Sequence, residues 1–179
     1  VETFRREFKE VKDYWYGIQR AAMRCIRTGI AQSFDHVSFD IKGPFLRMRL
    51  PSGRYLHYHS PKIEKRKAPW GDMKDTITYE GMSDKKQWTR QTTHPGKITE
   101  NADQAISRDL LAHGMMLAKR RYNLDIRLHV HDQIVCLVKE DEADAKLKLL
   151  IECMEESPKW APDLPLTSNG FTTRVFKKD

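Results

Sequence analysis

The chain has 179 residues, of which 39% are hydrophobic, so it is long and apolar enough for a buried core, and a disordered class is excluded. Lys and Arg outnumber Asp and Glu by 32 to 25, and the formal net charge of +7 favours a phosphate-rich partner. No apolar run is long enough to span a bilayer, no signal-peptide pattern is present, and the three cysteines lie in apolar runs typical of reduced core residues.

The first half of the chain changes its hydrophobic period once. Apolar residues three or four apart predict a helix over residues 3–28, with Gly29 as its stop. Alternating residues then predict strands within 34–59, with Pro51-Ser52-Gly53 as a hairpin turn. Residues 60–75 are rich in lysine and predict a basic loop. A further strand pair, "TITYEG" and "KQWTRQT", is expected to follow this loop.

The second half begins at His94-Pro95-Gly96, which interrupts the pattern. A long helix is expected from about Ile98 to Tyr122, a hairpin over 125–139 and a helix from about 141 to 157. The segment "GFTTRVF" at 170–176 predicts a closing strand. Helices that alternate with hairpins indicate an α+β fold, with an antiparallel sheet and helices packed on one face.

The predicted hairpin carries an unusual tip, because polar residues interrupt the apolar run "LHVHDQIVCLV" at 128–138. Asp132 and Gln133 are expected where the chain reverses, and neither matches the Asn-Gly or Asp-Gly pattern of a tight hairpin. A carboxylate at such a tip is a candidate ligand for Mg²⁺, which prefers oxygen. A solvated aspartate in a turn is the ordinary alternative, and this segment alone favours it.

Two further sets of polar residues are candidates for chemistry. Lys97, Asn101, Gln104 and Arg108 lie three or four apart, so a helix would present them as one stripe of donors to phosphates and base edges. An ordinary solvated face is the better interpretation of such a helix by itself. The pairs His57/His59 and His129/His131 would each share a strand face, but no third ligand at a standard spacing supports a zinc site.

Taken in order, these motifs resemble part of the family A DNA polymerases, the DNA polymerase I-like group, in its bacteriophage-type branch. The helix "GKITENADQAISRDLL" at 96–111 followed by the tip "LHVHDQ" at 128–133 carries most of the resemblance. "LPSGRYLHYHSP" at 50–61 and "LPLTSNGF" at 164–171 are similar to further segments of that branch. The resemblance therefore covers nearly the whole chain and rests on several ordered motifs.

The resemblance implies a fold and a division of the chain. Residues 1–29 would be a helical segment from the end of the fingers, and residues 30–179 would form a single compact palm-like α+β region. The implied activity is template-directed transfer of a nucleotide from a dNTP to a primer 3′-hydroxyl by two-metal catalysis. The implied location is the cytoplasm of a bacterial host, with a phage or prophage origin, and no membrane is involved.

The resemblance also implies roles for individual residues. Asp132 is carried over as a catalytic carboxylate and a ligand for the two Mg²⁺ ions, and His131 as a neighbour of the primer terminus. Lys97, Asn101 and Gln104 would contact the primer–template duplex. A metal ligand needs a fixed support, so the residues that flank the tip are expected to be largely buried: Val130, Ile134 and Cys136.

The chain departs from the family pattern at the tip and in two missing motifs. Gln133 stands where the family usually has a glutamate, which removes a negative charge beside Asp132. A "D-x-S-x-I-E" strand with the other metal-binding aspartate and an "R-x-x-x-K-x-x-x-[FY]-G-x-x-Y-G" helix for the nucleotide are both absent; both are expected before Val1. The chain alone is therefore expected to be inactive.

Several interpretations stay open at this point. The chain is a split-gene product that works with a second polypeptide supplying the missing motifs, a prophage remnant, or a truncated polymerase. The alternative function is a non-catalytic DNA-binding module that uses the basic surface. A metal-dependent nuclease would need a carboxylate cluster, and the spacing of Asp109, Asp132 and Asp141 does not form one.

Overall fold

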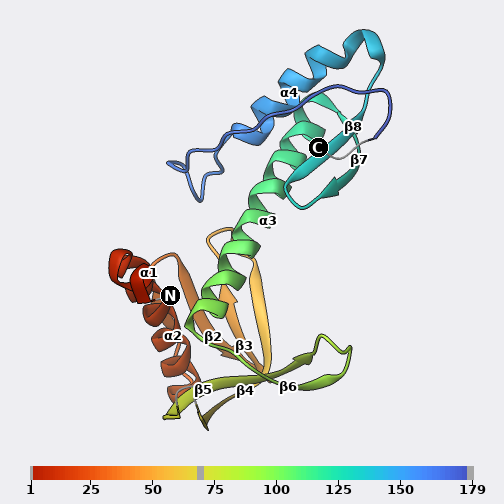
Figure 1. Ribbon diagram of the computed structural model, residues 1–179. Coiled ribbons are helices and arrows are strands. Elements are labelled where there is room, and N and C mark those ends of the chain that lie inside the picture. Colours follow the sequence, from red (N-terminus) through yellow and green to blue (C-terminus); the bar gives the residue numbers. More distant parts are fainter. Residues whose placement is uncertain (1, 68–70, 177–179) are drawn as a thin grey trace. The chain divides into compact units, whose positions relative to one another are not determined.

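The fold is α+β, which confirms the predicted class. A computed structural model describes residues 2–67 and 71–176. They divide into two compact units, one up to Gln104 and one from Ala105 onward, and each unit is described by itself. Helix α3 (Pro95–Tyr122) begins in the first unit and continues into the second (Figure 1). It confirms the long helix predicted after the break at His94-Pro95-Gly96.

The first unit opens with two consecutive helices, α1 (Glu2–Glu7) and α2 (Lys9–Thr28), where the periodicity predicted one. Phe8 separates them, because its backbone leaves the helical region. Gly29 ends α2 as predicted, with a φ of +69° and its N–H bonded to the Cys25 carbonyl at 2.8 Å. One face of α2 is buried and forms the helical half of the core: Gly17, Ile18, Ala21, Ala22 and Cys25.

Within the described residues, six strands form an antiparallel sheet in which each strand pairs with the next along the chain. The strands are β1 (Gln32–Phe34), β2 (Val37–Lys42), β3 (Phe45–Arg49), β4 (Tyr55–Lys67), β5 (Met73–Met82) and β6 (Trp88–Thr92). The predicted turn between β3 and β4 is confirmed, because Gly53 has a φ of +87° and donates its N–H to the Leu50 carbonyl at 2.9 Å. Strand β1 was not predicted.

The prediction of a basic loop over residues 60–75 is wrong for most of that segment. Strand β4 runs to Lys67 and β5 begins at Met73, while residues 68–70 lie outside the described part of the chain. A bulge at Ser60-Pro61 shifts the register between His59 and Lys62, which accommodates a proline that has no N–H to donate. The sequence of this part of β4 does not alternate between apolar and polar residues, because an exposed hairpin can be polar on both faces. The usual signal of a strand is therefore missing here.

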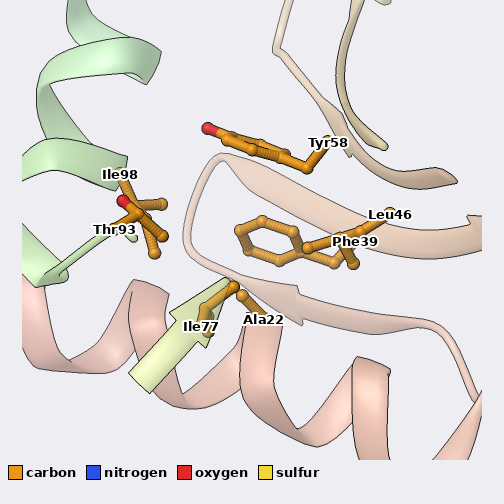
Figure 2. A pocket seen from close by; sticks show the side chains of 7 residues that line it. All are labelled: Ala22, Phe39, Leu46, Tyr58, Ile77, Thr93 and Ile98. Carbon is orange, nitrogen blue, oxygen red and sulfur yellow. The ribbon is translucent and has the colours of Figure 1, made fainter. Parts of the chain in front are cut away.

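The core of this unit lies between the sheet and its helices. Figure 2 shows a small apolar pocket in this core, lined by side chains from α2, from the sheet, from the connection between β6 and α3 and from the start of α3: Ala22, Phe39, Leu46, Tyr58, Ile77, Thr93 and Ile98. The alternation of β2 and β3 explains their positions, since Phe39 and Leu46 point inward while their neighbours along the strand do not. Helix α2 and the start of α3 therefore pack on the same face of this sheet, which confirms the prediction for these two helices.

The second unit contains the rest of α3, the hairpin β7 (Asp125–Val130) and β8 (Gln133–Leu137), the 3₁₀ turn η1 (Glu140–Glu142) and helix α4 (Ala143–Glu155). These elements confirm the predicted hairpin and the predicted last helix. The unit has its own small core, formed by Ala118, Leu124, Leu150 and Cys153. Of the described helices, none combines the length and apolarity that a bilayer crossing requires.

The predicted closing strand at residues 170–176 is wrong. Neither sheet of the described structure includes this segment. Its apolar residues, Phe171, Val175 and Phe176, are exposed, and Arg174 forms an ion pair with Glu140. Alternation produces a strand only where a neighbouring strand accepts its hydrogen bonds and a core covers one face, and this segment has neither among the described residues.

Candidate functional site

The tip of the β7–β8 hairpin places the predicted catalytic residues in a tight turn. Val130 pairs with Gln133, so the chain reverses at His131 and Asp132, one residue earlier than the sequence predicted. His131 has a φ of +52°, in the left-handed region, which costs a non-glycine residue about 1 kcal/mol. Both side chains are exposed. The carboxylate of Asp132 is thus presented outward by a strained turn between two paired strands.

The support beneath this tip is weaker than predicted. Val130 is 40% exposed, which contradicts the expectation that it is largely buried, and Ile134 and Cys136 are half-buried. The small core contacts Ile126 and Cys136, which pair across the strands near the base of the hairpin, and it also contacts Ile134, one pair away from the turn. The hairpin pairs as a two-stranded sheet, so within this unit its tip projects beyond that core.

Asp132 does not complete a metal site with the other described residues. Among them, no group of three or more His, Cys, Asp or Glu side chains is placed to hold a metal ion. Gln133, its neighbour along the chain, brings no charge, whereas Mg²⁺ usually binds one or two carboxylates together with substrate phosphates. The hairpin therefore offers one carboxylate ligand, and the donor set present does not by itself fit a two-ion centre.

The polar stripe on α3 also contains a carboxylate, Glu100, which was not among the predicted site residues. Lys97 donates to Glu100 at 3.1 Å, and the amide nitrogen of Gln104 donates to the same carboxylate, also at 3.1 Å. All three side chains are exposed. The signal was visible in the sequence, because Glu100 lies three residues after Lys97 and four before Gln104. A phosphate that approaches this stripe must compete with Glu100 for both donors.

Asn101, the third member of the predicted duplex contact, is directed into the first unit. Its side-chain nitrogen donates to the hydroxyl of Tyr58 at 3.0 Å. Tyr58 is buried, and burial raises the pKa of its hydroxyl, while the hydrogen bond from Asn101 acts in the opposite direction. In this structure Asn101 satisfies a buried phenol, so its immediate role is to join α3 to strand β4.

We expect the substitution Asn101→Ala to lower the free energy of unfolding by about 1–3 kcal/mol, because it leaves the buried Tyr58 hydroxyl without its partner. The control is Lys97→Ala on the same helix, which removes only an exposed ion pair and should cost less than about 1 kcal/mol. Urea denaturation followed by circular dichroism measures both values. Equal losses in the two variants would show that the Asn101–Tyr58 bond contributes little.

One histidine of each H-x-H pair has a polar partner in the protein. The Nδ1 atom of His59 lies 3.2 Å from Glu80, which Arg90 also binds at 2.8 Å. His129 lies 3.2 Å from the guanidinium of Arg108, so the last residue of the predicted stripe contacts the hairpin. These contacts account for both residues as members of polar networks on the protein surface.

The structure divides the predicted site between its two units. Lys97, Asn101 and Gln104 belong to the first unit, and His131 and Asp132 belong to the second. The first set is brought together around Glu100 and Tyr58, and the second shares one turn. That Asp132 and the stripe from Lys97 to Gln104 act at one site stays a prediction.

A comparison with known proteins finds a relative that matches this chain along its whole length. The chain is 34% identical over 180 residues to a protein named DNA polymerase from Bacillus phage SP02. The alignment covers the whole chain and 27% of that polymerase, so the chain spans about a quarter of its relative's length. No protein-family model matches the chain, and no solved structure matches it. The similarity confirms the predicted resemblance to a bacteriophage-type DNA polymerase.

Proposed function

We propose that this chain, similar along its whole length to part of a bacteriophage DNA polymerase, is the palm part of a template-directed polymerase of family A. The exposed carboxylate of Asp132, presented at the β7–β8 turn, is the observation that carries the proposal. A carboxylate at a tight turn between paired strands is a suitable single ligand for Mg²⁺. The similarity to the phage polymerase supports the assignment of this turn to a polymerase rather than to an ordinary solvated loop.

The proposal assigns each part of the chain a task. Residues 1–29 would be the end of the fingers, and residues 30–179 the palm-like region. Asp132 would supply one ligand of a centre for two Mg²⁺ ions, with His131 beside the primer terminus. Lys97 and Gln104 would contact the primer–template duplex after releasing Glu100, and Asn101 would hold α3 in place. The enzyme would act on DNA and dNTPs in the cytoplasm of a bacterial host.

The same proposal holds that the chain is inactive by itself. Phosphoryl transfer depends on the metal ions and on the groups that position the nucleotide. The chain has one exposed carboxylate at the proposed centre, and its sequence lacks the family motifs for the second aspartate and for the nucleotide. A second polypeptide or another region of the same polymerase would supply them.

We expect the purified chain to bind primer–template DNA weakly and without sequence preference, and to incorporate no nucleotide with Mg²⁺ or Mn²⁺. Affinity should fall steeply between about 50 and 200 mM salt, because neutralised phosphates release counterions. Fluorescence anisotropy measures binding, and a gel-based primer-extension assay measures incorporation. Lys97→Ala should reduce the slope of affinity against salt by about one phosphate contact.

Two outcomes would contradict this account. Binding that is independent of salt, or absent at low ionic strength, would remove the proposed contact with DNA. Primer extension that Asp132→Ala abolishes would show that the chain carries a complete centre. The alternative function, a non-catalytic DNA-binding module, rests on the net charge of +7 and on the single carboxylate of the tip. It predicts DNA binding and no turnover in any context, including a complete polymerase.

A further inference from the structure

The first unit has a second surface that the proposed function does not use, on the outer face of strands β2, β3 and β4 together with Trp88 of β6. The inner face holds Phe39, Leu46 and Tyr58 in the core with helix α2. Cross-strand pairing places Phe45 opposite His59 on the outer face. The pairs Arg47–His57 and Arg49–Tyr55 lie beside them on the same strands. Directly paired residues project to the same side of a sheet, so these rings and cations form one surface.

The rings of this surface form a continuous series, which we call the ring face. Their centroids are separated by 6.3 Å for Tyr55–His57, 5.6 Å for His57–Phe45, 5.2 Å for Phe45–His59 and 5.9 Å for His59–Trp88. Each pair is tilted or edge-on rather than stacked in parallel. Trp88 is 60% exposed and His57 is also exposed, so both rings have surface available to a planar partner.

Positive side chains accompany these rings. The guanidinium of Arg47 lies 4.3 Å from the centre of the Tyr55 ring and is held there by two hydrogen bonds to Asp40, at 2.7 and 2.5 Å. The Arg47 bond holds the pKa of Asp40 below its usual range. Lys42 pairs with Phe45, and Arg49 pairs with Tyr55. Both are exposed, and Lys42, like Arg47, acts electrostatically on Asp40.

We infer that the ring face binds single-stranded DNA. Unpaired bases stack on aromatic side chains, and nearby cations contact the phosphates, which is the arrangement of surfaces that bind single strands without sequence preference. A duplex suits this face less well, because its bases already stack on one another. The choice of DNA over RNA rests on the proposed function, and the occupant would be an unpaired strand of the polymerase substrate. This contact is separate from the duplex contact proposed for α3.

The test measures binding of the purified chain to a labelled oligothymidylate by fluorescence anisotropy at low salt. Trp88→Ala and His57→Ala should each weaken binding about 5- to 100-fold, the range that loss of one stacked ring produces. Trp88→Phe should retain most of the affinity, and Trp88→Leu should not, because leucine has no ring face. The matched control is Phe176→Ala, an aromatic residue that is 61% exposed outside the ring face and should leave affinity unchanged.

A blunt duplex, measured with the same proteins, separates this inference from the proposed function. Loss of oligothymidylate binding in the ring variants, with duplex binding and the circular dichroism spectrum unchanged, supports the ring face. Unchanged oligothymidylate affinity in both alanine variants would overturn it. If the wild-type chain binds duplex but not oligothymidylate, the ring face fails while the proposed function stands. If it binds oligothymidylate but not duplex, the duplex contact of the proposed function fails instead.

Discussion

Replacing Asp132 by asparagine in a complete polymerase is expected to lower turnover by at least about 10²-fold, the effect of losing one preorganised electrostatic group from an active site. The amide keeps the shape of the side chain but removes the negative charge, while Mg²⁺ favours carboxylate oxygen. DNA affinity should stay almost unchanged, because Asp132 is one exposed residue at a hairpin tip. The result would therefore be a loss of turnover without a loss of binding.

The experiment uses a chimera in which this chain replaces the matching segment of the Bacillus phage SP02 DNA polymerase. Single-turnover primer extension measures the chemical step, and anisotropy measures DNA affinity. Asp141→Asn is the matched control, since Asp141 is another exposed aspartate in the same unit and should leave both values unchanged. Gln133→Glu should be tolerated. Near-normal turnover in Asp132→Asn would end the catalytic assignment and leave the hairpin with a structural role.

The substitution Phe39→Ala is expected to lower the free energy of unfolding of the first unit by about 3–5 kcal/mol, the usual cost of truncating a buried phenylalanine. Phe39 is 1% exposed and lines the core pocket between the sheet and its helices, as Figure 2 shows. Removing the ring leaves a cavity that its neighbours fill only in part. A loss of this size is a large share of the stability of an ordinary domain.

The control for this substitution lies on the same strand. Ile41 is 38% exposed, so Ile41→Ala should cost about 1 kcal/mol or less. Urea denaturation of both variants, followed by circular dichroism, gives the two free energies. Similar losses in the two variants would mean that Phe39 does not occupy the core of the unit.

The hydrophobic period of the sequence predicted most of the local structure. Helix α3 and the hairpin β7–β8 were expected close to their observed bounds, because a period of 3.6 or 2 reports which side of an element is apolar. The predictions were wrong where the hydrophobic period is absent, or where it is present but the segment has no neighbouring strand. Strand β4 continues through charged residues up to Lys67, and the segment at 170–176 alternates without forming a strand.

At the candidate site, the sequence predicted which residues are important but not which contacts they make. Asp132 and His131 were recognisable in the sequence, since polar residues interrupted an apolar hairpin. The position of the turn was not, because the register depends on which residues pair across the strands, here Val130 with Gln133. Asn101 was expected to contact the primer–template duplex, and no sequence pattern indicated its bond to Tyr58, a residue more than forty positions away along the chain.

The sequence by itself determined the α+β class, the resemblance to a phage polymerase and the presence of a carboxylate in the hairpin, because these depend on composition, periodicity and motif order. Only the tertiary structure decided that Val130 is exposed and that Asn101 satisfies a buried phenol. It also decided that residues of three strands assemble the ring face. These properties depend on contacts between residues that are distant in the chain. No local sequence pattern predicts such contacts, because they are determined by which surfaces pack together when the chain folds.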